Sequence, residues 1–180
     1  MNDRRRFKSE FQYLEKVEIF QMTYLSDGLK IKGFLVVPKK EGKYPCIIFN
    51  RGGFGELGKI DDKLLFFLLA LLSSKGYVII CSQYRGSVGS EGKDEYGGAD
   101  INDVVNLIPA LGYVNKADTS RIGMYGVSRG GMMTYIALTK TKKIKAAVVW
   151  AGISDSFNKF VSSVYFPNRI LIADGESTNI

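Results

Sequence analysis

Residues 121–131 read Arg-Ile-Gly-Met-Tyr-Gly-Val-Ser-Arg-Gly-Gly. The first five are typical of a short strand, and residues 131–139 have the composition of a helix. The glycines between them indicate a tight turn that holds Ser128 between the end of the strand and the start of the helix. The stretch therefore predicts a strand–turn–helix unit, the building block of an α/β protein.

The same alternation continues on both sides of this unit. Apolar runs predict strands at 46–49, 77–81, 145–150 and 169–173, and helices are expected at 63–74 and 99–111, with Asp100 and Asp103 suited to the first turn of the second helix. Continuous apolar strands that alternate with helices indicate a parallel sheet covered on both faces. Near the N-terminus, β-rich runs at 17–25 and 29–37 flank Ser26-Asp27-Gly28, which signals an antiparallel hairpin. We predict an α/β three-layer sandwich with this hairpin at one edge of the sheet.

Composition restricts the class of protein. The chain has 180 residues, of which 46% are hydrophobic, so it can bury a core, and we expect one domain over residues 1–180. No apolar run is long enough to cross a bilayer and no apolar signal core follows the basic N-terminus, which predicts a cytoplasmic protein without a membrane partner. Cys46 and Cys81 lie in apolar runs and are interpreted as buried thiols. We expect no metal, because the chain has no His and no paired Cys, and no nucleotide cofactor, because no Gly-x-Gly-x-x-Gly follows a strand.

The formal net charge of +7 raises the question of nucleic-acid binding. Apart from residues 4–6 and the lysines between 140 and 145, the basic residues are dispersed, and aromatic residues are not interleaved with them. The lysines at 140–145 lie between a predicted helix and a predicted strand, where a solvated turn explains them. We therefore expect no nucleic-acid partner.

The chemistry is carried by Gly126-Val127-Ser128-Arg129-Gly130. Gly-x-Ser-x-Gly between a strand and a helix is the pattern of a nucleophile elbow, in which the serine is exposed above the end of the sheet. The alternative interpretation is a tight turn whose serine only caps the helix. Acyl transfer also needs preorganised donors for an oxyanion. One is the N–H of Arg129, and the other is expected in the loop Arg51-Gly52-Gly53-Phe54 after an earlier strand.

Several collinear stretches together resemble the catalytic domain of the prolyl oligopeptidase family of serine peptidases, within the α/β-hydrolase fold. They cover roughly residues 20 to 155 and comprise residues 26–28, 44–45, 51–54, 84–87, 97–103 and 117–131. The resemblance implies that Ser128 is the nucleophile and that the Arg129 N–H, Gly52 and Gly53 form the oxyanion hole. Where some members have a Tyr whose hydroxyl donates to the oxyanion, this chain has Arg51, so the side-chain donor is either a guanidinium or lost.

The C-terminal part departs from the family pattern. The family's triad continues with Asp and then His, but this chain contains no His. In the segment aligned on Gly175, Thr178 takes the acid position and neither Asp174 nor Glu176 replaces it, and residues 158–166 are shorter than usual. We expect the fold to lack the family's last strand and helix, with self-association through the uncovered sheet edge.

These observations predict a serine peptidase or esterase that acts on a peptide or a small ester or amide through an acyl-enzyme on Ser128. A serine hydroxyl is a poor nucleophile without a base. The alternative is therefore a catalytically inactive remnant, or a hydrolase fold that only binds.

Overall fold

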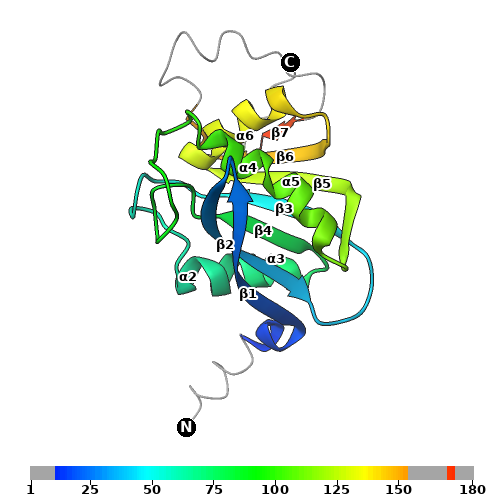
Figure 1. The fold of residues 1–180 in the computed structure, drawn as a ribbon. Coiled ribbons are helices and arrows are strands. Elements are labelled where there is room, and N and C mark those ends of the chain that lie inside the picture. The colour runs from blue at the N-terminus through cyan, green and yellow to red at the C-terminus, as the bar shows by residue number, and fades with distance from the viewer. Residues whose placement is uncertain (1–10, 154–169, 173–180) are drawn as a thin grey trace.

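The structure is a computed structural model, and the description is of residues 11–153 and 170–172 (Figure 1). A seven-stranded sheet with the order β1-β2-β4-β3-β5-β6-β7 runs through the molecule. β1 pairs antiparallel with β2 and β2 antiparallel with β4, whereas β4, β3, β5, β6 and β7 are parallel neighbours. The predicted α/β class, with a mostly parallel sheet and an antiparallel N-terminal pair, is confirmed.

The hairpin forms where the sequence predicts it. A short 3-10 helix, η1 (Gln12–Lys16), leads into β1 (Val17–Ser26), and β2 (Leu29–Pro38) follows. Ser26 pairs with Leu29, and the two residues between them, Asp27 and Gly28, have φ values of 52° and 81°. Positive φ at both positions defines the primed turn that matches the twist of two antiparallel strands.

The remaining strands are β3 (Tyr44–Asn50), β4 (Val78–Ser82), β5 (Ala117–Val127), β6 (Ile144–Trp150) and β7 (Ile170–Ile172). Each contains or overlaps a predicted strand, and β5 is longer than expected at both ends. Two register shifts interrupt the parallel ladders of the described sheet, one between β3 and β5 and one between β5 and β6.

Helices cover both faces of the sheet. The predicted helix at 63–74 is present as α2 (Asp62–Leu64), the π-helical segment η2 (Leu65–Ala70) and α3 (Leu71–Ser74). The helix at 99–111 is divided into α4 (Ile101–Val105), α5 (Leu107–Ala110) and the 3-10 turn η3 (Leu111–Tyr113). Pro109 lies within α5, where the missing N–H weakens a continuous helix. The last described helix, α6 (Arg129–Lys140), begins directly after Ser128.

Two apolar clusters hold these layers together. One joins the sheet to α4, α5 and α6 through residues such as Ile48, Val104 and Met133. The other joins the opposite face to η2 through residues such as Phe49 and Leu69. Figure 1 shows α2 and α3 on one side of the sheet and α4, α5 and α6 on the other. The result is the predicted three-layer arrangement.

Within the described ranges, no helix is both long and apolar enough to cross a membrane. The segment 158–166 and the residues Asp174, Glu176 and Thr178 lie outside the described residues.

Candidate active site

Ser128 occupies the sharp turn between β5 and α6. Its φ and ψ are 53° and −119°, a conformation that L side chains rarely adopt. Two main-chain hydrogen bonds fix the turn: the Ser128 N–H donates to the Trp150 carbonyl at 2.9 Å, and the Gly131 N–H donates to the Ser128 carbonyl at 2.8 Å. Backbone strain of this kind persists only where the surroundings enforce it, and it is concentrated at functional sites.

Two glycines make this turn sterically possible. A Cβ on Gly130 would lie 1.8 Å from the carbonyl oxygen of Asn50, and one on Gly126 would lie 2.3 Å from the carbonyl oxygen of Gly130. Both distances are far below van der Waals contact, so any side chain at these positions would push α6 away from β3 and β5. The spacing Gly-x-Ser-x-Gly therefore follows from the close packing of a strand, a helix and the next strand around the serine.

The loop after β3 lies next to the serine. A methyl group on Gly52 would stand 3.3 Å from the Cβ of Ser128 and 3.9 Å from its Oγ. Gly53 has a φ of 74°, and a Cβ there would lie 2.0 Å from the Leu57 carbonyl. The structure thus brings together Ser128, Arg129 and Gly52, three of the residues that the sequence assigned to one site.

Main-chain donors are available beside Ser128. α6 begins at Arg129. The N–H groups in the first turn of a helix have no acceptor within that helix and lie at its positive end. The Arg129 N–H is therefore oriented for an acceptor outside the helix, as an oxyanion donor must be.

The side chain of Arg51 is directed elsewhere. It is fully buried, and its guanidinium donates to the carbonyls of Gly52, Gly55, Leu57 and Gln83 at 2.7–3.2 Å. A further donation reaches the hydroxyl of Ser87 at 3.1 Å. Of the two sequence alternatives, a guanidinium donor or none, the geometry favours none, because the five N–H groups of Arg51 are occupied in shaping the loop.

Tyr84 supports the loop that begins at Arg51. Its hydroxyl donates to the Arg51 carbonyl at 3.0 Å, and its ring lies under the guanidinium groups of Arg51 and Arg129, 4.9 Å and 4.8 Å from the ring centroid. Tyr84 is itself at a positive φ of 65° and is fully buried. Burial raises its pKa, so the hydroxyl remains protonated and continues to donate.

The side chain of Arg129 forms the centre of a buried ion network. It donates to Asp94 through both Nη atoms, at 2.8 Å and 2.6 Å, and Nη2 also pairs with Asp100. Nη1 donates to the Gly53 carbonyl at 2.9 Å, and the guanidinium lies 4.8 Å from the ring centroid of Tyr96. Arg129 therefore links the elbow to the Gly52–Gly53 loop, and its buried side chain joins the two walls of the site.

Burial and charge act in opposite directions on this network. Desolvation works to raise the pKa of Asp94, but hydrogen bonds from Arg129 and from the N–H groups of Gly55 and Tyr96 outweigh it and lower that pKa. Desolvation prevails at Asp100, whose pKa is raised despite the nearby arginine charge. At Arg129, desolvation is outweighed by the hydrogen bond to Asp94 and the charge of Asp100, so the pKa is raised. The guanidinium stays charged and Asp94 is the carboxylate held most firmly ionised.

A second ion pair stabilises the segment that carries these acids. The guanidinium of Arg85 donates to both carboxylate oxygens of Asp103 and to Asp27 in the hairpin turn, its shortest contacts being 2.8 Å. The sequence placed Asp100 and Asp103 at the start of a helix, and they do lie there. Neither carboxylate caps that helix; each is used by a buried arginine instead.

The side-chain role of Arg129 and the participation of Asp94, Tyr84 and Tyr96 were not predicted from the sequence. The available signal was the number of charged residues in the glycine-rich stretch 84–103, which is unusual for a segment between two buried elements. Buried charges are found where they are paired. A partner for these acids was therefore to be expected, although the sequence does not say which cation supplies it.

The Ser128 hydroxyl has no hydrogen-bond partner among the described residues, and in the same ranges no three His, Cys, Asp or Glu side chains cluster as a metal site would require. The elbow thus presents a hydroxyl that is available to react, beside main-chain donors. The fold and this elbow together define the class: an α/β-hydrolase.

Comparison with known proteins narrows that class. A family model described as X-Pro dipeptidyl-peptidase (S15 family) matches residues 27–178, and the chain belongs to this family. The uncharacterized peptidase YtmA of Bacillus subtilis is 32% identical over 155 residues, which are 85% of this chain and 57% of that protein. The chain thus spans little more than half the length of this relative.

Solved structures agree with the fold. An acylaminoacyl peptidase from Pyrococcus horikoshii is 31% identical with a TM-score of 0.64, covering 81% of this chain and 25% of that one. Esterase Est22, at 19% identity and a TM-score of 0.65 over 82% of this chain and 48% of that one, shows likeness in fold alone. The expected membership of a serine peptidase family with an α/β-hydrolase fold is confirmed, whereas the narrower prolyl oligopeptidase assignment stays a prediction.

Proposed function

We propose that this chain is the nucleophile-bearing part of a serine hydrolase of peptidase or esterase type, with Ser128 as the residue that forms the acyl-enzyme. The observation that carries the proposal is the conformation of Ser128, φ 53° and ψ −119°, at the C-terminal end of β5 and directly before α6. A residue that only capped the helix would bond a first-turn N–H through its side chain. Ser128 makes no such bond.

The chemical step follows from this arrangement. The Oγ of Ser128 attacks the carbonyl carbon of an ester or amide, and its proton leaves to a base. The negative charge on the former carbonyl oxygen is stabilised by the N–H of Arg129 and by main-chain donors of the Gly52–Gly53 loop. The bond to the alcohol or amine then breaks, that group takes up a proton, and water later releases the acyl group from Ser128.

The proton acceptor sets the expected rate. None of the 180 residues is a His, so this polypeptide supplies no imidazole. Loss of one triad member leaves roughly 10³–10⁴-fold acceleration over water, from the oxyanion hole and binding. We therefore expect activated esters to acylate Ser128 of the isolated chain. Amides should be turned over poorly.

The experiment compares the chain with Ser128→Ala on two substrates, p-nitrophenyl acetate and an X-Pro p-nitroanilide, the second chosen from the family description. We expect ester acylation that is lost in Ser128→Ala, with one acetyl group mapped to the peptide that contains Ser128. Equal release of p-nitrophenol by both proteins would contradict the proposal. Anilide cleavage would assign peptidase activity, and acylation without it would favour an esterase.

A second candidate, a hydrolase fold that binds without catalysis, is favoured by one observation: the Ser128 hydroxyl lacks a base within the described residues. Under this alternative the folded protein would bind an X-Pro dipeptide saturably and form no acyl-enzyme with either substrate.

A further inference from the structure

The two ends of the sheet differ in charge. Where β3, β5 and β6 begin, the stretches 15–18, 38–44, 74–76, 115–121 and 140–145 hold eleven Lys and Arg against four Asp and Glu. At the Ser128 end, the stretches 27–30, 51–63 and 85–103, with residue 129, hold seven basic and nine acidic residues. The positive charge of the described part of the molecule is therefore concentrated at the end opposite Ser128, which we call the basic end.

A hollow opens at the basic end, between the starts of β5 and β6 and the end of α5. Its volume is about 410 Å³, which falls in the range of small-molecule pockets. The core residues Ile108 and Ile122 and the exposed Pro109 give it apolar walls. Lys142, Lys143, Lys145, Thr119 and Ser120 supply its polar groups. A partly apolar hollow with amines at its rim suits a molecule that has both an anionic and an apolar part.

The polar groups lie where the sheet departs from regular pairing. Pro45 pairs with Asp118 and Cys46 with Ile122, so Thr119, Ser120 and Arg121 have no partner in β3. On the other side, Ile122 pairs with Ile144 and Gly123 with Ala146, which leaves Lys145 as an extra residue in β6. Both register shifts of the described sheet thus occur at this hollow. Bulges of this kind re-aim side chains next to sites.

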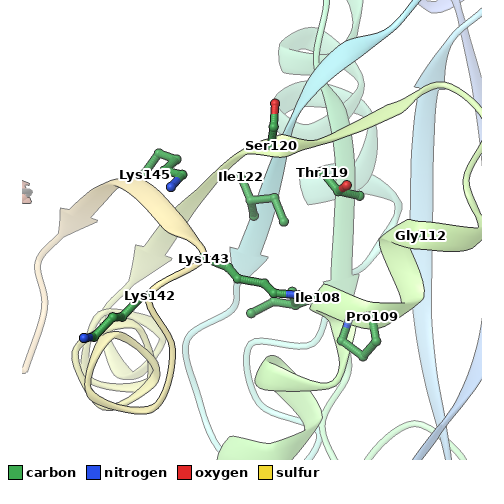
Figure 2. Close-up of a pocket in the computed structure, with 9 residues that line it drawn as sticks. All are labelled: Ile108, Pro109, Gly112, Thr119, Ser120, Ile122, Lys142, Lys143 and Lys145. Atoms are coloured by element: carbon green, nitrogen blue, oxygen red, sulfur yellow. The ribbon is translucent and has the colours of Figure 1, made fainter.

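The amines at this hollow carry unpaired charge. Within the described residues, no carboxylate pairs with Lys142, Lys143 or Lys145. Figure 2 shows the side chain of Lys143 reaching across towards Ile108 and Pro109, whereas Lys142 points away from them.

The acid that precedes Thr119 in β5 is already engaged. Asp118 accepts from Arg121 at 2.7 Å and from the Ser120 hydroxyl at 2.6 Å. The Thr119 hydroxyl, in contrast, has no hydrogen-bond partner in the part of the chain that the structure describes, and it remains free to donate.

We propose that this hollow binds a small phosphate-bearing molecule with an apolar or planar part, through Lys143, Lys145 and the Thr119 hydroxyl. The amines bond the phosphate oxygens as charge-assisted donors, and the apolar part packs on Pro109 and the accessible edge of Ile108. A small ligand is favoured over an extended polyanion, because the donors line one hollow of ligand size and no arginine or aromatic residue lines it.

A second hollow provides a matched control. It measures about 490 Å³ and is lined by Lys16, Lys39, Lys40 and Lys75 among others, also at the basic end. A paired acid lies close by in the chain: Glu41, which follows Lys40, forms an ion pair with Lys116 at 3.2 Å. The double variants Lys143→Gln/Lys145→Gln and Lys39→Gln/Lys40→Gln remove the same charge from the two hollows.

The test is calorimetric titration of the full chain with ADP, pyrophosphate and adenosine at fixed salt. We expect saturable binding of ADP, weaker by at least about tenfold in Lys143→Gln/Lys145→Gln and unchanged within about twofold in Lys39→Gln/Lys40→Gln. Adenosine is expected to bind at least about tenfold more weakly than ADP. Thermal melts of both variants confirm that each is folded.

Three results would overturn the proposal. Absence of saturable ADP binding would show that the hollow is not a binding site. Equal loss of ADP affinity in the two double variants would show that binding results from general attraction by the net charge. Tighter binding of a single-stranded oligonucleotide than of ADP, with a steep fall as salt rises, would identify an extended polyanion surface instead. Because Ser128→Ala leaves this hollow untouched, the outcome is independent of the proposed hydrolase activity.

Discussion

The charged residues at the two ends of the central sheet differ in burial and in pairing. At the Ser128 end, Arg51 and Arg129 are fully buried, and apart from the Nε of Arg129 their donors bond carbonyls, the Ser87 hydroxyl, Asp94 and Asp100. At the basic end, the lysines at 142, 143 and 145 are exposed and have no carboxylate partner among the described residues. Buried, paired charge fixes geometry, because removing one member strands the other in a medium that solvates it poorly. Exposed charge has little effect on the geometry of the fold and remains available to bind a ligand.

The largest difference between the two ends is expected in stability. Arg129→Met leaves Asp94 and Asp100 buried without their cation, and we expect it to lower the free energy of unfolding by about 3–5 kcal/mol. The same change at Lys143, which is exposed, should alter it by less than about 0.5 kcal/mol. Urea unfolding monitored by circular dichroism measures both.

A triple variant shows whether stranded charge is the cause. Arg129→Met combined with Asp94→Asn and Asp100→Asn removes the charges together, and it should recover a substantial part of the loss. If Arg129→Met alone costs less than about 1 kcal/mol, the network does not hold the two walls of the site together.

Glycine substitutions compare how tightly the two ends of the sheet are packed. In Gly130→Ala the new methyl group would meet the Asn50 carbonyl at 1.8 Å, so we expect a loss of at least about 3 kcal/mol in the free energy of unfolding. A methyl group on Gly112, at the basic end, would meet no atom within 4 Å, and Gly112→Ala should stay within about 0.5 kcal/mol of the parent. Comparable losses in both variants would show that the elbow is no more tightly packed than the opposite end.

The smallest effect concerns Asp118, a half-buried acid at the basic end. Hydrogen bonds from Ser120 and Arg121 lower the pKa of Asp118 from 3.8 to about 2. A depressed folded-state pKa stabilises the fold above the unfolded value, and that contribution is lost as the pH falls from about 4 towards 2. Carboxyl NMR should therefore give a midpoint near pH 2 that moves up towards 3.8 in Ser120→Ala/Arg121→Gln. An unchanged midpoint in the variant would mean that these contacts do not persist in solution.

Sequence patterns predicted the fold well because its determinants are local. Asp27-Gly28 specifies the hairpin turn, and the apolar runs locate the parallel strands. Gly126 and Gly130 mark the elbow for the same reason: the steric constraint falls on positions close to Ser128 in the chain.

Local sequence patterns did not predict the ion network around Arg129. Arg129 meets Asp94 and Asp100 from 35 and 29 residues away, across a glycine-rich stretch whose path the sequence does not define. Arg51 shows the same limit, because its position fits an oxyanion donor while carbonyls of its own loop and of Gln83, which follows β4, accept its hydrogen bonds. The hollow at the basic end depends on two register shifts, which hydrophobic periodicity does not reveal.

The central claim, that the Ser128 end is built for acyl transfer, is tested most directly by labelling the folded chain with a fluorophosphonate probe and mapping the modified peptide. We predict a single label on Ser128, absent from Ser128→Ala and unaffected in Lys143→Gln/Lys145→Gln. Absence of label on protein that unfolds cooperatively, or equal labelling of Ser120 and Ser128, would contradict the account.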